Sequence, residues 1–251
     1  MYSRVYRPKS KNLNRTMEYK VFGKSGKICL AFPPQDGRWW DFENFGMVET
    51  VANWIEAGKL QLVLVDGIDH ESWTAEGDEH ERILMQERWF HYVVDELLPT
   101  LRKRNPDAPE DAMTTGCSMG AMHAANFFFR RPDLFDATIC LSGIYSANFF
   151  IPGYTDPLTY DNSPIDFLPN MPQNHPWMDL YRTSDIILCV GQGAWEDDLL
   201  ESTRAMDAIL ASKGIPAWVD YWGHDVAHDW DWWQKQLPYF MYHLLGSPAA
   251  E

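Results

Sequence analysis

The fold is decided by the stretch Thr115-Gly116-Cys117-Ser118-Met119-Gly120-Ala121-Met122-His123-Ala124. It contains Gly-x-Ser-x-Gly, preceded by a short β-leaning run and followed by apolar residues at helical spacing. A strand, a sharp turn and a helix are the setting in which this motif presents a nucleophilic serine. The two glycines allow a tight turn, so we expect Ser118 at a strained position with its hydroxyl exposed. The N–H of Met119 would then point at an oxyanion formed on a carbonyl that Ser118 attacks.

Size and charge restrict the class of protein. The chain has 251 residues, 45% of them hydrophobic, which is enough for one large, well-buried α/β domain. A net charge of -15 argues against nucleic acid and anionic membrane surfaces as partners. No apolar run approaches the length of a membrane span, and residues 1–4 lack the apolar core of a signal peptide. We therefore expect a cytoplasmic protein, and the sequence leaves a homo-oligomer open.

The cysteines and histidines bear on whether the protein binds a metal. Each cysteine falls in or beside a run typical of a central strand, where a free thiol behaves as a small hydrophobe: Cys29, Cys117, Cys140 and Cys189. The paired spacings of a Cys-ligated metal are absent. His224 and His228 are four residues apart, a spacing that could bind zinc on a helix, but Gly223 and the strand before it favour a loop. We expect neither a metal nor a cofactor.

Strand-like and helix-like segments alternate along most of the chain. The strand-like runs are residues 18–22, 27–32, 60–65, 112–115, 137–141, 186–190 and 217–222, and the helical ones are 45–57, 83–97, 121–129, 199–213 and 230–245. Nearly all-apolar strands that alternate with helices predict right-handed crossovers and a mostly parallel sheet. The fold expected is an α/β, three-layer αβα sandwich, with antiparallel strands contributed by the N-terminal residues.

Residues 142–184 interrupt this alternation. The segment is rich in Pro, Asn, Asp and aromatic residues and has no sustained period. A loop this long in a compact domain is usually functional, so we expect a single domain over residues 1–251 with 142–184 as a lid or cap insertion. Its aromatic residues, with Trp73 and Trp195 in nearby loops, predict either an apolar acyl pocket or simple packing of the lid onto the domain.

A serine hydroxyl is a weak nucleophile until a base takes its proton, so the motif predicts a histidine and an acid further along the chain. In the order serine, acid, histidine, each partner should follow a later strand. The carboxylates of Glu196, Asp197 and Asp198 follow the run that ends at Val190, and two histidines follow the last strand. This match of order and position is the strongest functional signal in the sequence.

The chain resembles the putative esterase family of the α/β-hydrolase superfamily, which is related to esterase D (S-formylglutathione hydrolase), antigen 85 and the enterochelin esterases. The resemblance spans nearly the whole chain, including residues 32–38, residues 65–73, the Ser118 motif and the closing His228-Asp229-Trp230. It implies the α/β-hydrolase fold and His228, rather than His224, as the catalytic histidine.

The resemblance also bears on the acid and on the oxyanion donors. Relatives often carry Gly-x-x-Asp where this chain has a Glu at position 196, which favours Glu196 as the acid, with Asp197 as the alternative. A second oxyanion donor is expected in the loop after the first core strand. That loop begins with two prolines, which have no N–H to give, and so Gln35 or Asp36 is left.

These observations predict a serine esterase, a carboxylic-ester hydrolase with an acyl-enzyme on Ser118 and His228 as general base. Its substrate would be a small ester or thioester. Two alternatives stay open: an acyltransferase of the same fold that uses an alcohol as acceptor, and a non-catalytic pseudohydrolase that uses the pocket for binding.

Overall fold

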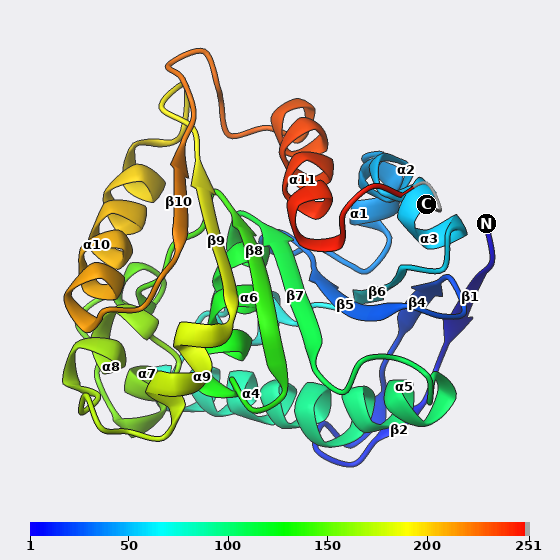
Figure 1. The fold of residues 1–251 in the computed structure, drawn as a ribbon. Coiled ribbons are helices and arrows are strands. Elements are labelled where there is room, and N and C mark those ends of the chain that lie inside the picture. The colour runs from blue at the N-terminus through cyan, green and yellow to red at the C-terminus, as the bar shows by residue number, and fades with distance from the viewer. Residues whose placement is uncertain (249–251) are drawn as a thin grey trace.

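An eight-stranded sheet in the order β1-β4-β6-β5-β7-β8-β9-β10 forms the centre of the computed structural model, which describes residues 1–248 (Figure 1). In this order the strands are β1 (Ser3–Tyr6), β4 (Tyr19–Phe22), β6 (Leu60–Val65), β5 (Lys27–Phe32), β7 (Ala112–Cys117), β8 (Phe135–Leu141), β9 (Asp185–Val190) and β10 (Trp218–Tyr221). A separate hairpin pairs β2 (Lys9–Ser10) with β3 (Arg15–Thr16).

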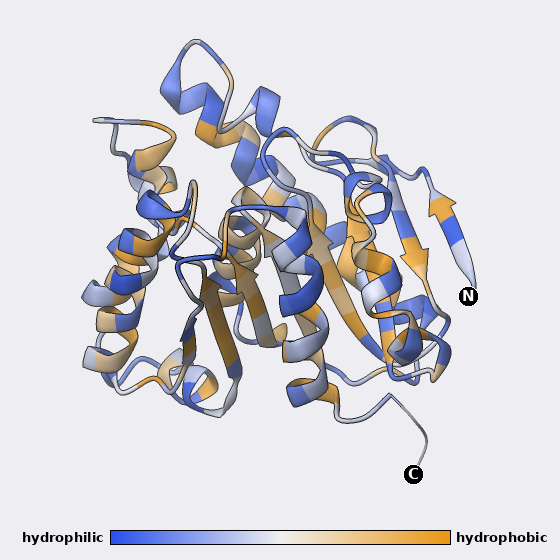
Figure 2. Ribbon diagram, turned by 90° about the horizontal axis from the view of Figure 1, so that it is seen from above, coloured by the Kyte–Doolittle hydropathy of each residue, from blue (hydrophilic) through white to orange (hydrophobic). Residues whose placement is uncertain are grey.

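The direction of the strands follows the sequence expectation. Every pair from β6 to β10 is parallel, whereas β4 pairs antiparallel with both β1 and β6. The mostly parallel sheet with antiparallel N-terminal strands is therefore confirmed. Parallel strands are covered on both faces, which explains why β6 and β7 are buried at every position. Figure 2 shows the hydrophobic residues gathered on these central strands.

Two helical layers cover the sheet. One face carries α1 (Asp41–Asn44), α2 (Met47–Thr50), α3 (Ala52–Glu56) and α11 (Trp230–Leu245), and the other carries α4 (Glu79–His91), the π-helical turn η2 (Tyr92–Leu97), α5 (Leu98–Arg104), α6 (Met119–Arg130) and α10 (Asp197–Lys213) (Figure 1). Side chains of β5 alternate between the two layers: Leu30 belongs to the core cluster that includes α6, and Cys29 belongs to the one that includes α2 and α11. The three-layer sandwich is confirmed.

Two helices differ from the sequence expectation. The single helix predicted over residues 45–57 is two short helices, α2 and α3, which are separated at Val51. The first of them starts only after Gly46, which takes the left-handed conformation with φ 75°. The helix predicted over residues 83–97 continues to Arg104. The π-helical turn precedes Pro99, a residue that has no N–H for a regular helical hydrogen bond.

The segment 142–184 is structured rather than an open loop. It contains one short 3₁₀ turn and three short helices: η3 (Ala147–Phe149), α7 (Pro157–Asp161), α8 (Pro164–Asn170) and α9 (Trp177–Thr183). Helix α8 packs against α6 and α10, and Tyr145 and Tyr181 are fully buried. Packing onto the domain therefore accounts for part of the aromatic content, and a role as lid stays a prediction.

All four cysteines are buried and free, and burial raises the pKa of each thiol. Cys117, next to Ser118, stays protonated and is a poor nucleophile for that reason. Within residues 1–248, none of the helices combines the length and the apolar character that a membrane crossing requires.

Candidate active site

Ser118 lies in a sharp turn between β7 and α6, with φ 58° and ψ -126°. Two glycines allow this turn because other backbone comes too close for a side chain. A Cβ on Gly116 would lie 2.2 Å from the carbonyl carbon of Gly120, and a Cβ on Gly120 would lie 2.3 Å from the carbonyl oxygen of Phe32. The N–H of Ser118 donates to the Leu141 carbonyl at 2.9 Å, which ties the turn to β8. The sequence therefore folds here into the strained turn that the motif predicted.

His228 faces Ser118 from the loop between β10 and α11. Its Nε2 lies 2.9 Å from the Ser118 Oγ, and its backbone N–H donates to the Ala194 carbonyl at 2.9 Å. The Trp233 ring and the imidazole pack in a T-shaped arrangement, with ring centres 4.9 Å apart. His224 is exposed in the same loop. Residues 223–229 are not helical, so the two histidines do not share the helix face that a zinc site with this spacing needs.

Glu196 is the acid that the structure places beside His228. It is fully buried, and its Oε2 lies 3.5 Å from the His228 Nδ1. Among the described residues neither of these two atoms has a hydrogen-bond partner, so they face each other alone. The distance is long for a hydrogen bond, as is common before substrate binds. Asp197 and Asp198 are exposed in the first turn of α10, where acids suit the helix dipole.

Ser142 and Trp233 complete the site and were not predicted from the sequence. The Ser142 hydroxyl donates to the Glu196 Oε1 at 2.6 Å and accepts from the Trp233 Nε1–H at 3.2 Å. Ser142 is fully buried and has φ 54°. One carboxylate oxygen of Glu196 is thus fixed, and the other is left for His228. No motif marks Ser142, which is simply the first residue after the strand β8.

The two expected oxyanion donors differ in what their N–H groups contact. Met119 opens α6, where a first-turn N–H has no acceptor within the helix. In the loop after β5, the N–H of Asp36 donates to the Asp69 Oδ2 at 3.1 Å and is therefore occupied. Gln35 is exposed, and within residues 1–248 its N–H has no hydrogen-bond acceptor. Of the two candidates in this loop, Gln35 has the free donor.

Backbone strain gathers around the same site. Residues 1–248 hold five residues other than glycine with positive φ: Asn14, Asp36, Ser118, Ser142 and Trp195. All but Asn14 belong to the loops that carry the candidate site. Strained residues of this kind cost about 1–3 kcal/mol each and cluster where function requires them. Trp195 stands out because its large apolar side chain is also 84% exposed, directly before the buried Glu196.

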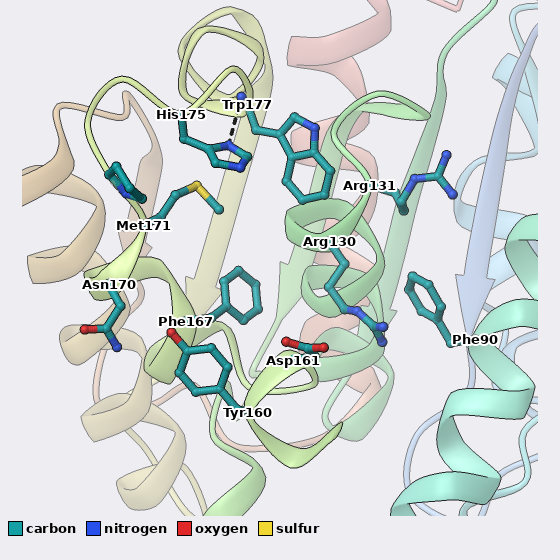
Figure 3. Close-up of a pocket in the computed structure, with 11 residues that line it drawn as sticks. Phe90, Arg130, Arg131, Tyr160, Asp161, Phe167, Asn170, Met171, His175 and Trp177 are labelled. Atoms are coloured by element: carbon teal, nitrogen blue, oxygen red, sulfur yellow. Dashed lines mark hydrogen bonds between the residues drawn. The ribbon is translucent and has the colours of Figure 1, made fainter. Parts of the chain in front are cut away.

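The aromatic side chains of residues 142–184 do not form one wall. Phe150 and Tyr154 pack against the cluster of Trp73, Met119 and Met122 next to the serine turn. Tyr160, Phe167 and Trp177 instead line a separate cavity of about 410 Å³ (Figure 3). That cavity includes Arg130 at the far end of α6, twelve residues and roughly 18 Å along the helix from Ser118. It therefore lies apart from Ser118 and the candidate active site.

Comparisons with known proteins bear on the family and on the fold. A family model described as "Putative esterase" matches residues 10–243. A ferulic acid esterase structure superposes with a TM-score of 0.75 at 18% identity, over 98% of this chain and 99% of the other. An S-formylglutathione hydrolase from Agrobacterium tumefaciens gives 0.73 at 14% identity, over 96% and 93%. MPT51 (FbpC1) of Mycobacterium tuberculosis gives 0.72 at 13% identity, over 99% and 100%.

At these identities the structural neighbours establish the fold alone. A search of curated protein sequences gives no significant match.

Proposed function

The chain belongs to the putative esterase family, and on this premise we propose that it is a serine carboxylic-ester hydrolase that works through an acyl-enzyme on Ser118. The observation that carries the proposal is the 2.9 Å contact between the Ser118 Oγ, in its strained turn, and the His228 Nε2. Small esters and thioesters are the substrate class, which fits the neighbours described as a ferulic acid esterase and an S-formylglutathione hydrolase.

The first half of the reaction acylates the serine. For the His228 Nε2 to accept the serine proton, its Nδ1 must carry a hydrogen, and the Glu196 carboxylate facing Nδ1 favours that tautomer. The Ser118 Oγ then attacks the ester carbonyl, and the N–H groups of Met119 and Gln35 stabilise the oxyanion. When the tetrahedral intermediate collapses, the imidazolium of His228 gives its proton to the leaving alcohol or thiol.

The second half hydrolyses the acyl-enzyme. Water takes the place of the leaving group, gives its proton to the His228 Nε2 and attacks the acyl carbonyl. The tetrahedral intermediate then expels the Ser118 Oγ, which takes this proton back from His228, and the carboxylic acid leaves. The buried Glu196 carboxylate stabilises the imidazolium formed in both halves, and its hydrogen bond from Ser142 holds it in place. An alcohol in place of water would make the same site an acyltransferase, and a panel of esters with and without added alcohols separates these two reactions.

A fluorophosphonate probe tests the proposal directly. We expect stoichiometric labelling of the native protein, with the modified peptide containing Ser118, and no labelling after heat denaturation, because an unfolded serine has no base to activate it. The matched control is Ser212, which is exposed on α10 and makes only a local hydrogen bond to the Ile209 carbonyl. A native protein left unlabelled would favour the pseudohydrolase alternative.

Trp195 is expected to contact the substrate. Its backbone is strained and its ring is exposed, so the side chain contributes little to folding. Trp195→Gly should therefore unfold at the same or a higher temperature, since glycine adopts positive φ freely. We expect kcat/KM for a benzoyl ester to fall about tenfold, the value of one lost aromatic contact, with little change for an acetyl ester.

Two measurements check this expectation. Steady-state kinetics on matched benzoyl and acetyl esters of p-nitrophenol give the selectivity, and thermal unfolding gives the stability. Tyr242→Ala serves as control, because Tyr242 is also exposed but lies near the end of α11. Equal losses on both esters would show that Trp195 does not select the acyl group.

A further inference from the structure

A buried pair, Asp69 and His123, lies next to the candidate site but takes no part in the chemistry proposed for it. Asp69 begins the short turn η1 (Asp69–Glu71) after β6, and His123 lies on α6. Each is 1% exposed, and the Asp69 Oδ1 accepts from the His123 Nε2–H at 2.8 Å. Burying a carboxylate is costly unless its oxygens are hydrogen-bonded, so the contacts of this one indicate what it does.

The second oxygen of Asp69 contacts the oxyanion loop, residues 33–37 after β5. Asp69 Oδ2 accepts from the backbone N–H of Asp36 at 3.1 Å. A single carboxylate thus joins the helix that follows the nucleophile to the loop that carries Gln35. Asp36 is held from a second side, because its own carboxylate accepts from the Thr74 hydroxyl. The Thr74 N–H in turn donates to the Asp69 carbonyl at 2.9 Å.

These contacts fix the backbone where position matters most. Asp36 is at φ 55°, and its amide shares a peptide group with the carbonyl of Gln35. With the Asp36 N–H turned toward Asp69, the N–H of Gln35 remains free. An oxyanion donor helps only when it is within hydrogen-bond distance of the developing charge, so a shift of about 1 Å is expensive.

We propose that Asp69, oriented by His123, is a positioning residue for the oxyanion hole. It holds residues 33–37 against the start of α6, so that the N–H of Gln35 and the N–H of Met119 both donate to the same oxyanion. The proposal rests on the proposed function, since it assigns a role within the same acyl transfer. Loss of this link should lower the rate of the chemical step while leaving substrate affinity nearly unchanged.

Substitution of His123 tests the link. His123→Leu removes the donor to Asp69, whereas His123→Gln can still donate through its amide. With p-nitrophenyl acetate we expect kcat of the leucine variant to fall by between about tenfold and a hundredfold. This fall is no larger than the one caused by losing a whole oxyanion donor. KM should stay within about twofold of the wild-type value. The glutamine variant should recover most of that loss.

A matched control separates positioning from stability. The hydroxyl of Thr114 is also buried and also bonds to α6, through the Ala124 carbonyl at 3.0 Å, but it does not touch the oxyanion loop. Thr114→Val should lower the unfolding temperature and leave kcat unchanged. If His123→Leu behaves in the same way, the pair is merely structural and the proposal is overturned.

Two further measurements keep the outcomes distinct. Thr74 is partly exposed, so Thr74→Val should fold even if the His123 variants do not, and it should lower kcat a few-fold at constant KM. An unchanged kcat in a folded Thr74→Val variant would count against the positioning role of Asp69. Turnover by the wild-type protein tests the esterase function independently of the variants. If the wild type does not turn over esters, the proposed function is overturned. If the wild type is active and the variants are equally active, only the positioning role is overturned.

Discussion

Replacing Ser118 with alanine should lower kcat/KM for p-nitrophenyl acetate by three or more orders of magnitude. The change removes only the hydroxyl, whose hydrogen bond within residues 1–248 is to the His228 Nε2. Without it no acyl-enzyme can form, and the residual rate comes from the oxyanion donors and binding alone. Initial rates at several enzyme concentrations measure the effect.

The fold should survive this change. Alanine has the same backbone cost at φ 58° as serine. Within residues 1–248, the group that loses a hydrogen-bond partner is the imidazole of His228, which is partly exposed. The unfolding temperature should therefore match that of the wild type. Ser212→Ala, at an exposed position on α10, should leave both rate and stability unchanged. Wild-type-like turnover by Ser118→Ala would contradict the proposed mechanism.

Sequence periodicity predicted most of the sheet, because buried parallel strands are apolar along their whole length. Strands β5, β6, β8 and β9 fall within about two residues of the expected runs. The helices on the two faces were less predictable. The apolar spacing of residues 45–57 fits one helix, yet Gly46 and Val51 break it, since Gly46 adopts a backbone conformation that periodicity does not reveal.

The candidate site, too, was only partly predictable from the sequence. The order of Ser118 and His228 along the chain led us to expect them together, and the structure brings them to 2.9 Å. The order of residues did not show which of Glu196, Asp197 and Asp198 is the acid. These three are neighbours, and the turn of the chain before α10 decides which of them points inward. That turn passes through the strained Trp195 and directs Glu196 inward.

The supporting contacts had no sequence signal. Ser142 and Glu196 are 54 residues apart, as are Asp69 and His123, and neither pair belongs to a motif with fixed spacing. His123 lies within the stretch that decides the fold, but the sequence around it indicates only that it is part of a helix. Only the approach of two loops and a helix at one edge of the sheet gives these side chains their partners.

The identity of the acid leads to the second large effect: Glu196→Gln should reduce kcat by about three to four orders of magnitude. The amide has the same shape as the carboxylate, and its oxygen can keep the hydrogen bond from Ser142. Its NH₂ group would then face the His228 Nδ1, which must accept from it. The imidazole hydrogen moves to Nε2, which can no longer take the serine proton.

Asp197→Asn is the matched control, because it makes the same chemical change one residue away on an exposed side chain. It should keep kcat within about twofold of the wild type, as expected for an exposed charge in a helix first turn. The unfolding temperature separates catalysis from folding: Glu196→Gln removes a buried charge and should leave stability equal or slightly higher. If Asp197→Asn instead loses activity and Glu196→Gln keeps it, Asp197 is the acid, and the loop before α10 must rearrange when substrate binds.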